Sequence, residues 1–248
     1  MNLLAEAFAW IFSADRLGGS SPLLASIGQH LFYTFLALVI AAAIAMPVGF
    51  FIGHTGRGRG LAIGVSGAAR AVPSFGLILL LVLVIGVTQK PLAATIAFVL
   101  LGIPSILAGA YAGLEAIDRR VIDAARAVGM TEWQILWRVE VPLGLPLLIG
   151  GLRAGALQIV ATVVLAAYVD LGGLGTYIIK GLALKQYDSI LGSAIVIVAL
   201  ALVLDGVFAL AQKFVVPRGV AAGRTQEVRS SPSRRRVVVG TPIEQGKR

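Results

Sequence analysis

The chain of 248 residues contains no cysteine and only two histidines, His30 and His54. The lack of cysteine excludes disulfide frameworks, thiolate metal sites and cysteine nucleophiles, and two histidines are too few to predict a histidine-based site. The sequence also contains no Walker A motif, no Gly-x-Ser-x-Gly motif, and no paired carboxylates or metal-ligand spacing. We therefore expect no catalytic residue, no cofactor and no metal site in this chain.

Charged residues are scarce as well, at 13% of the chain, whereas 58% of residues are hydrophobic. This composition is too apolar for an ordinary water-soluble domain and predicts an all-α membrane protein, because a helix satisfies its own backbone polar groups in lipid. A span of about 30 Å needs roughly 20 apolar residues in a helix. Residues 3–12 are too few for a span, and we interpret them as an interfacial helix. The stretches that meet the requirement for a span are residues 30–52, 71–87, 92–114, 143–167 and 190–211.

The 21 basic residues outnumber the 12 acidic ones, and such an excess can indicate either a nucleic-acid partner or a membrane topology. With the N-terminus outside, six arginines of the loops and nine basic residues after position 212 face the cytoplasm, against four basic residues outside. This asymmetry follows the positive-inside rule. We therefore expect an outside N-terminus, a cytoplasmic C-terminus and no nucleic-acid partner.

The composition also divides the chain into three parts. Residues 1–27 are predicted to form the interfacial helix and a linker, and residues 28–217 the membrane domain. Residues 218–248 replace the apolar pattern with Gly, Ser, Pro and Arg, which predicts a basic, disordered cytoplasmic tail. Such a tail either touches anionic lipid head groups or is simply a solvated end.

Small residues repeat at every fourth position within the predicted spans, which predicts close helix packing. Backbone approach of this kind is a main association force in lipid, and it serves packing within one subunit or an interface between subunits. The stripes are Ala37, Ala41, Ala45, Gly49 and Gly53 in the first span, Gly109 with Gly113, and Gly151 with Gly155.

Residues 115–142 form the one long polar segment between predicted spans, and they are expected to face the cytoplasm. A first amphipathic helix is predicted by the spacing of Ile117, Val121, Ala124, Ala125 and Val128. Gly129 is placed to end it in the left-handed conformation. Thr131 and Gln134 then fit a capping box for a second helix, which Pro142 is expected to close.

This segment also fits the spacing of a DNA-binding helix-turn-helix at Ala125, Gly129 and Ile135. A groove-reading helix needs polar contacts to base edges and basic contacts to phosphates. Residues 132–138 offer two tryptophans and one arginine instead, and they are tethered to a span. The DNA-binding alternative is therefore disfavoured.

The same segment resembles the EAA loop of permease subunits in binding-protein-dependent ABC importers, whose pattern is Glu-Ala-Ala, Gly, Ile and Leu-Pro. Three conservative departures separate the two patterns, namely Asp for Glu, Val for Ile and Val for Leu. The matching positions in this sequence are Asp123-Ala124-Ala125, Gly129, Val139 and Val141-Pro142.

The resemblance implies a type I importer (MetI-like) permease core in the bacterial cytoplasmic (inner) membrane. It also implies a non-catalytic subunit that pairs with a second permease, identical or paralogous. Two copies of an ABC ATPase and an extracytoplasmic substrate-binding protein are the further partners. Asp123 would make a polar contact with the ATPase, Ala124 and Ala125 would form the close-packed face, and Gly129 would be the bend.

Four further stretches resemble the osmoprotectant branch of these permeases, which imports glycine betaine, choline or carnitine. Amino-acid or methionine-type importers share the same core, so that substrate class remains an alternative. The low aromatic content, 7% of residues, argues against an aromatic cage for a quaternary ammonium group. The stretches are residues 70–74, 150–153, 171–175 and 215–219.

Three charged residues lie in or near the predicted spans, namely Arg70, Arg153 and Asp205. Intramembrane charges are costly and are usually paired, so we expect a salt bridge between Arg153 and Asp205, directly or through Arg70. A secondary transporter driven by ions would need several intramembrane acids, and Asp205 alone gives that alternative little support. Pro73 and Ser74 interrupt the second span, which predicts either a simple kink or a substrate pathway position.

Overall fold

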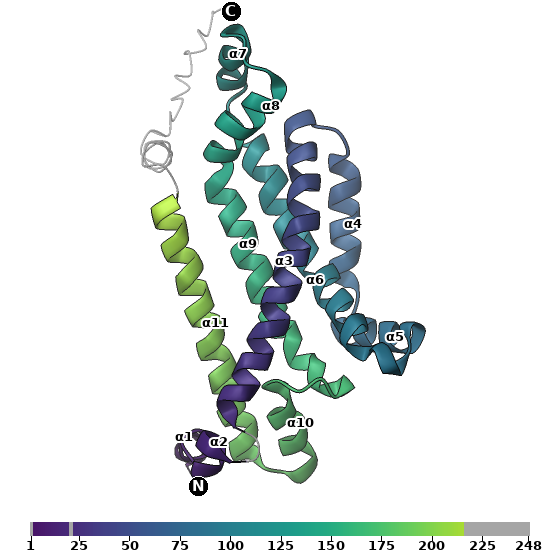
Figure 1. Ribbon diagram of the computed structural model, residues 1–248, viewed down its shortest axis with the longest axis vertical. Coiled ribbons are helices and arrows are strands. Elements are labelled where there is room, and N and C mark those ends of the chain that lie inside the picture. Colours follow the sequence, from purple (N-terminus) through teal and green to yellow (C-terminus); the bar gives the residue numbers. More distant parts are fainter. Residues whose placement is uncertain (1, 20–21, 216–248) are drawn as a thin grey trace, which may run out of the picture. The chain divides into compact units, whose positions relative to one another are not determined.

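A computed structural model describes residues 2–19 and 22–215, and within these ranges it contains helices and no strands (Figure 1). The predicted all-α class is therefore confirmed for the described part of the chain. The expected tail, residues 218–248, lies outside the described residues. The helices are α1 (Leu3–Ile11), α2 (Ala14–Gly18), α3 (Leu23–Thr55), α4 (Arg59–Ala71), α5 (Ser74–Ile85), η1 (Val87–Gln89), α6 (Lys90–Glu115), α7 (Arg119–Ala127), α8 (Glu132–Ile135), η2 (Leu136–Glu140), α9 (Val141–Val163), η3 (Val164–Val169), α10 (Gly175–Leu184) and α11 (Tyr187–Val215).

Four helical runs in the described residues are long and apolar enough to cross a membrane, and they contain α3, α6, α9 and α11. They confirm four of the five predicted spans, although α3 begins seven residues before the predicted start at position 30. The fifth prediction, a span over residues 71–87, is wrong in its boundaries. In its place α4 and α5 meet at an angle of 90°, so five spans result only if this bent pair counts as one.

Pro73 explains the break between α4 and α5. The ring of a proline restricts the residue before it to extended backbone, and Val72 accordingly has φ −71° and ψ 127°. Pro73 caps the N-terminus of α5, where its missing N–H costs nothing. The predicted interruption is therefore confirmed, and it is a sharp turn rather than a slight kink.

The packed centre of the structure is formed by α6 with α3 on one side and α9 on the other (Figure 1). The predicted small-residue stripes lie at these two contacts. A Cβ atom on Gly49 would lie 2.4 Å from the Cβ of Ala110, and one on Gly109 would lie 2.5 Å from the Cα of Gly151. Both distances are too short for real atoms, so only glycine lets the backbones approach this far. The stripes therefore serve packing within one subunit.

The helix α11 packs more loosely, and its contacts lie mainly with α9, α10 and α1. At its N-terminal end, Ser193 donates a hydrogen bond of 2.7 Å to the carbonyl of Leu174. Gly192 leaves space there for the ring of Trp10 from α1. The predicted helix over residues 3–12 is thus confirmed as α1, while its interfacial position stays a prediction.

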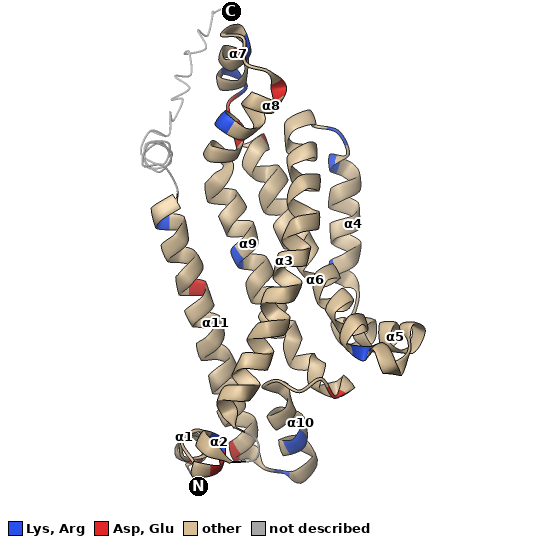
Figure 2. Cartoon of the chain, viewed as in Figure 1, with Lys and Arg blue, Asp and Glu red and all other residues tan. Residues whose placement is uncertain are grey.

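Charged residues gather at the two ends of the helices and leave the middle nearly free of charge (Figure 2). Away from the ends, α9 carries a basic position and α11 an acidic one, which pair with each other (Figure 2). This distribution is typical of a chain whose helices cross an apolar layer.

Candidate functional site

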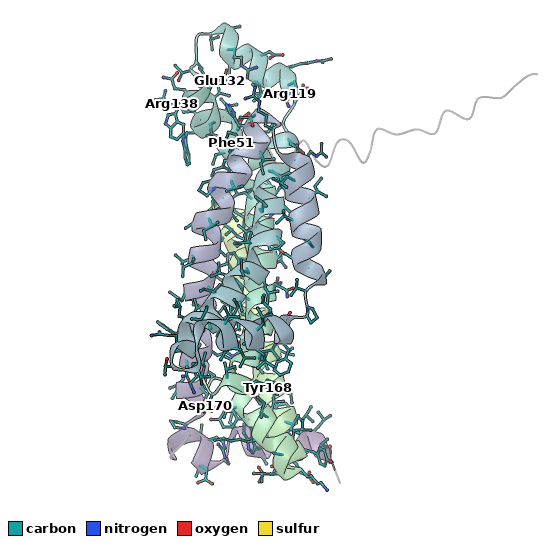
Figure 3. The ribbon with its side chains drawn as sticks, turned by 90° about the vertical axis from the view of Figure 1, so that its right-hand side faces the viewer. Phe51, Arg119, Glu132, Arg138, Tyr168 and Asp170 are labelled. Atoms are coloured by element: carbon teal, nitrogen blue, oxygen red, sulfur yellow. The ribbon has the colours of Figure 1, made fainter. Side chains whose placement is uncertain are left out.

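The helices α7 and α8 project beyond the end of the α3, α6 and α9 bundle (Figure 1). Figure 3 shows Arg119, Glu132 and Arg138 at this end, whereas Tyr168 and Asp170 lie at the opposite end. We call residues 115–142 the linking segment, because it connects α6 to α9. It contains most of the charged side chains at this end of the described residues.

Local capping interactions define the two helices of the linking segment. The carboxylate of Asp118 accepts a hydrogen bond of 2.9 Å from the backbone N–H of Arg120 and caps the start of α7. Gly129 has φ +83°, which confirms the predicted left-handed end. Thr131 and Gln134 form the predicted capping box at the start of α8. The cap at Asp118 was not predicted, although an aspartate directly before a helical pattern is a usual N-cap signal.

The linking segment has a small hydrophobic core of its own. Its buried members are Ile122, Ala125 and Ile135, and Ile117, Met130 and Val139 pack against them. The predicted apolar face of α7 is therefore wrong at Val121, Ala124 and Val128, which are exposed. Ile122 takes their place on the inward side of α7, because it packs there with Ile135 of α8.

This orientation of α7 separates the two alanines of the Asp-Ala-Ala motif. Ala125 is 8% exposed and packs within the segment, whereas Ala124 lies on the exposed side of α7. Asp123 is also exposed, with 70% of its side chain accessible. The free face of α7 thus presents Asp123 and Ala124, and Ala125 instead holds α7 against α8.

An ion pair joins α7 to α8 across the turn at Gly129. Arg126 donates to the two carboxylate oxygens of Glu132 over 2.8 and 3.1 Å, and it approaches Asp123 at 3.5 Å. The hydrogen bond with Glu132 raises the pKa of Arg126 further above its ordinary value. This bidentate contact fixes the relative orientation of the two short helices.

The second helix of the segment does not end where the sequence predicted. Pro142 was expected to close it, but α8, η2 and α9 form one continuous helical run. Residues 136–140 form a turn with π-helical hydrogen bonds, and Pro142 sits in the first turn of α9, where its missing N–H is tolerated. The linking segment is therefore continuous with a long helix of the bundle.

His54, near the C-terminal end of α3, connects that helix to the linking segment. Its Nδ1 lies 2.6 Å from Oε2 of Glu140, and its Nε2 lies 3.3 Å from Oε2 of Glu132. Sequence reasoning set both histidines aside and missed this contact. No local pattern relates positions that are 86 residues apart in the chain, so no signal in the single sequence could have revealed it.

A groove of about 540 Å³ lies between α3 and the linking segment. Apolar and aromatic side chains form most of its walls, and His54 and Glu132 lie at its polar end. Its aromatic members are Phe50, Phe51, Trp133 and Trp137.

The structure brings together two of the three predicted intramembrane charges. The guanidinium of Arg153 on α9 donates from Nε and Nη2 to the two carboxylate oxygens of Asp205 on α11. Arg70 does not take part. It is exposed at the end of α4, a helix whose main contact is with α6. The alternative of a bridge through Arg70 is therefore wrong, because α4 lies against a different helix.

The other predicted pathway residues, Pro73 and Ser74, lie with Arg70 at the 90° bend between α4 and α5. The ring of Phe75 in α5 packs on that of Tyr168 in η3, with centroids 4.6 Å apart. This contact ties the bend region to the end of the bundle opposite the linking segment (Figure 3).

Comparisons with known proteins agree with this arrangement. Residues 45–219 match the family described as "Binding-protein-dependent transport system inner membrane component", and the chain belongs to this family. It is a non-catalytic permease subunit of an ABC importer in the bacterial cytoplasmic membrane, which it crosses several times. Permeases of this family work with an ATPase, a substrate-binding protein and a second permease.

Several relatives can be named individually. The chain is 30% identical over 198 residues to the glycine betaine/carnitine/choline transport system permease protein OpuCB of Bacillus subtilis, covering 80% of this chain and 90% of OpuCB. It is 32% identical to the carnitine transport permease protein OpuCB of Listeria monocytogenes, over 82% of this chain and 92% of the relative. It is also 32% identical to the osmoprotectant import permease protein OsmW of Salmonella typhimurium, over 77% and 91%.

A solved structure shares the fold. A chain of the MetNI methionine ABC transporter in an inward-facing conformation superposes with a TM-score of 0.67 at 20% identity. The match covers 79% of this chain and 96% of that chain. The expected MetI-like permease core is thereby confirmed.

Proposed function

We propose that this permease subunit imports osmoprotectants such as glycine betaine, choline or carnitine, and that α7 is the helix through which ATP hydrolysis drives it. The single observation that carries the coupling role is the exposed face of α7 with Asp123 and Ala124, held rigidly by Ala125 and the Arg126 to Glu132 pair. The named substrates of the relatives support the substrate class.

In this proposal the linking segment faces the cytoplasm, the N-terminus lies outside, and one ATPase contacts each of two permeases. Ala124 has no side chain beyond Cβ, so it permits a partner surface to approach the backbone of α7 closely. Asp123 beside it offers a carboxylate that can accept hydrogen bonds at the rim of the contact. An ATPase surface that closes on this face would push α7 sideways.

Such a push reaches the membrane domain through α9. The helical run from α8 through η2 to α9 is continuous, so a rotation of the linking segment moves α9. Gly129 provides the bend between α7 and that run. Rigid-body motion about short connections is a common device in switching proteins. We infer that α9 is the element through which the nucleotide state of the ATPase reaches the substrate pathway.

The pathway itself is proposed to pass the bend between α4 and α5. Broken helices often mark substrate sites in transporters, because the interrupted backbone exposes polar groups. Pro73 and Ser74 lie at this break, and the exposed guanidinium of Arg70 lies beside it. A guanidinium suits the carboxylate of glycine betaine or carnitine.

The coupling role can be tested with single cysteines, because the chain contains none. Ala124→Cys on α7 is compared with Leu182→Cys, an exposed position on α10, in transporter co-purified with its ATPase and binding protein. We expect Ala124→Cys to crosslink to the ATPase and Leu182→Cys to remain uncrosslinked. A crosslink from Leu182→Cys alone would show that the proposed orientation is reversed.

The substrate is tested in proteoliposomes that contain the complete transporter. We expect ATP-dependent uptake of radiolabelled glycine betaine, choline or carnitine that stops when the ATPase is omitted. Mass spectrometry of the ligand carried by the co-purified binding protein identifies the substrate independently. Uptake that follows an ion gradient without ATPase would refute the proposal, and a bound methionine or another amino acid would refute its substrate class.

A further inference from the structure

We propose that His54 is a positioning residue of the transport cycle, which clamps the linking segment to α3 through its contacts with Glu140 and Glu132. This inference rests on the proposed role of α7 in coupling. It adds a second mechanical connection, from the linking segment to α3, beside the covalent one to α9.

The geometry of the clamp is that of one imidazole between two carboxylates. The Nδ1 atom of His54 is 2.6 Å from Glu140, and the Nε2 atom is 3.3 Å from Glu132. Glu132 in turn holds Arg126 of α7 through two hydrogen bonds. The chain of contacts therefore runs without interruption from α7 through α8 to α3, and from α3 to the π-helical turn before α9.

The burial of Glu140 makes the loss of its contact with His54 costly. Only 5% of the Glu140 side chain is accessible, and 17% of the His54 side chain, whereas 56% of Glu132 is accessible. A buried carboxylate without a hydrogen-bond partner is strongly disfavoured. Glu140 thus depends on His54, and it stays in its place only while α3 and the turn at η2 remain together.

The two contacts of His54 are not equal. An ionised carboxylate only accepts hydrogen bonds, so Nδ1 of His54 is the donor to Glu140. The approach of Nε2 to Glu132 is longer, so the contact with Glu140 carries most of the clamp.

Charged groups on the neighbouring elements define the surroundings of this bridge. Glu132 of α8 and Glu140 of η2 face His54 directly, and Arg126 of α7 stands behind Glu132. On α6, which packs along α3, Glu115 is paired with Arg59 of α4 at 3.6 Å. Both charged groups that face His54 directly are therefore carboxylates.

The mechanical consequence concerns α3. With the clamp closed, a push on α7 displaces both α3 and α9, because both are tied to the same segment. With the clamp open, the linking segment is held to the bundle by its helical continuity with α9 and by the short connection to α6, and less of the motion reaches α3. We therefore expect His54 to set how much transport results from each ATP hydrolysed, rather than whether the ATPase binds.

The test measures the number of glycine betaine molecules imported per ATP hydrolysed by the complete transporter in proteoliposomes. The flexible amide of His54→Gln does not hold the two carboxylates at the fixed spacing of the ring, and we expect about a fivefold or greater fall in this ratio, as for loss of a hydrogen bond to a charged group. His54→Lys supplies a donor that reaches the carboxylates, and we expect it to restore much of the ratio.

Arg57→Gln is the matched control, because it removes an exposed cation three residues away. We expect it to keep the wild-type ratio. Hydrogen exchange of residues 119–135 in the same complexes gives a readout that is independent of the substrate. Protection there should decrease in His54→Gln and remain in Arg57→Gln.

Glu132→Gln covers the case in which His54→Gln does not fold, because this half-exposed carboxylate makes the longer of the two contacts with His54 and otherwise pairs with Arg126. An intermediate fall of about two- to threefold in the ratio is then expected. Wild-type coupling and protection in His54→Gln, or a ratio in His54→Lys no higher than in His54→Gln, would overturn the clamp. The crosslink from Ala124→Cys to the ATPase separates the two proposals: if it forms while His54 has no effect, only the clamp fails.

Discussion

The helices α6 and α11 are both apolar, yet they are held in opposite ways. In its most apolar stretch, 61% of the run containing α6 is buried in the described structure, against 6% for α11. The backbone of α6 meets α3 and α9 directly through glycine and alanine. The helix α11 is tied to α9 by the pair of Arg153 and Asp205 and by a hydrogen bond of 3.1 Å from Gln212 to the carbonyl of Pro146.

This difference shows what holds helices together in a membrane. Apolar side chains gain little by leaving lipid, so close backbone contact and polar pairs carry the association. The helices α3, α6 and α9 associate through close backbone contact and form a fixed core. The outer helix α11 is held by polar pairs and keeps its apolar surface free for lipid or for the second permease that the family requires.

The largest effect is expected from breaking the fixed core. Gly151→Leu places a side chain where the Cα of Gly109 lies 2.7 Å from the new Cβ, whereas a Cβ on the adjacent Gly150 meets nothing within 4 Å. We expect Gly151→Leu to destabilise the subunit by about 3 kcal/mol or to prevent folding, and Gly150→Leu to have little effect. The unfolding temperature of the detergent-purified protein measures this, and equal behaviour of the two variants would contradict the packing of α6 on α9.

A smaller effect is expected from breaking the tie to α11. Arg153→Met leaves the carboxylate of Asp205 without its partner. Because both side chains are about one third exposed, we expect a fall in stability that is smaller than for a fully buried pair and smaller than that of Gly151→Leu. The double variant Arg153→Asp with Asp205→Arg should recover most of the stability lost by either single reversal. Persistent loss in the double variant would show that the two charges act separately.

Much of this comparison could be predicted from the sequence. Long apolar runs and the four-residue spacing of glycine and alanine are local patterns, and both were confirmed. The pairing of Arg153 with Asp205 was also predictable, because two opposite charges in apolar helices have few other ways to be satisfied. The break at Pro73 follows from the covalent structure of proline, but its angle of 90° depends on tertiary contacts such as that of Phe75 with Tyr168.

The candidate site was only partly predictable for a related reason. The capping box and the turn at Gly129 are short-range features, and both were confirmed. The rotation of α7 that buries Ile122 and exposes Val121 depends on which side chains α8 presents to it. The contact of His54 with Glu140 depends on the packing of distant segments, and the single sequence contains no signal for that.

The linking segment differs from both α6 and α11, because local backbone geometry holds it outside the packed core. Gly129 has φ +83° and open space around its Cα, so Gly129→Ala tests conformation alone. We expect a cost of about 1 kcal/mol, confined to this segment, because L-residues are strained in the left-handed region. Asparagine tolerates that region, so Gly129→Asn should be milder. Hydrogen exchange of residues 119–135 measures the local effect, and a lower unfolding temperature of the bundle would contradict its confinement.

The smallest effect is expected from the cap of α8. The Thr131 hydroxyl accepts a hydrogen bond of 3.3 Å from the backbone N–H of Gln134, and the Gln134 side chain accepts one of 3.0 Å from the N–H of Thr131. Thr131→Ala removes the first contact and should cost about 1 kcal/mol or less, whereas Thr131→Ser should keep it. The end of α8 that follows the cap is held by its continuation through η2 into α9. We therefore expect hydrogen exchange to increase only for residues 131–135. An increase that spreads into α9 would mean that the linking segment and the core unfold as one unit, and the distinction drawn between them would then fail.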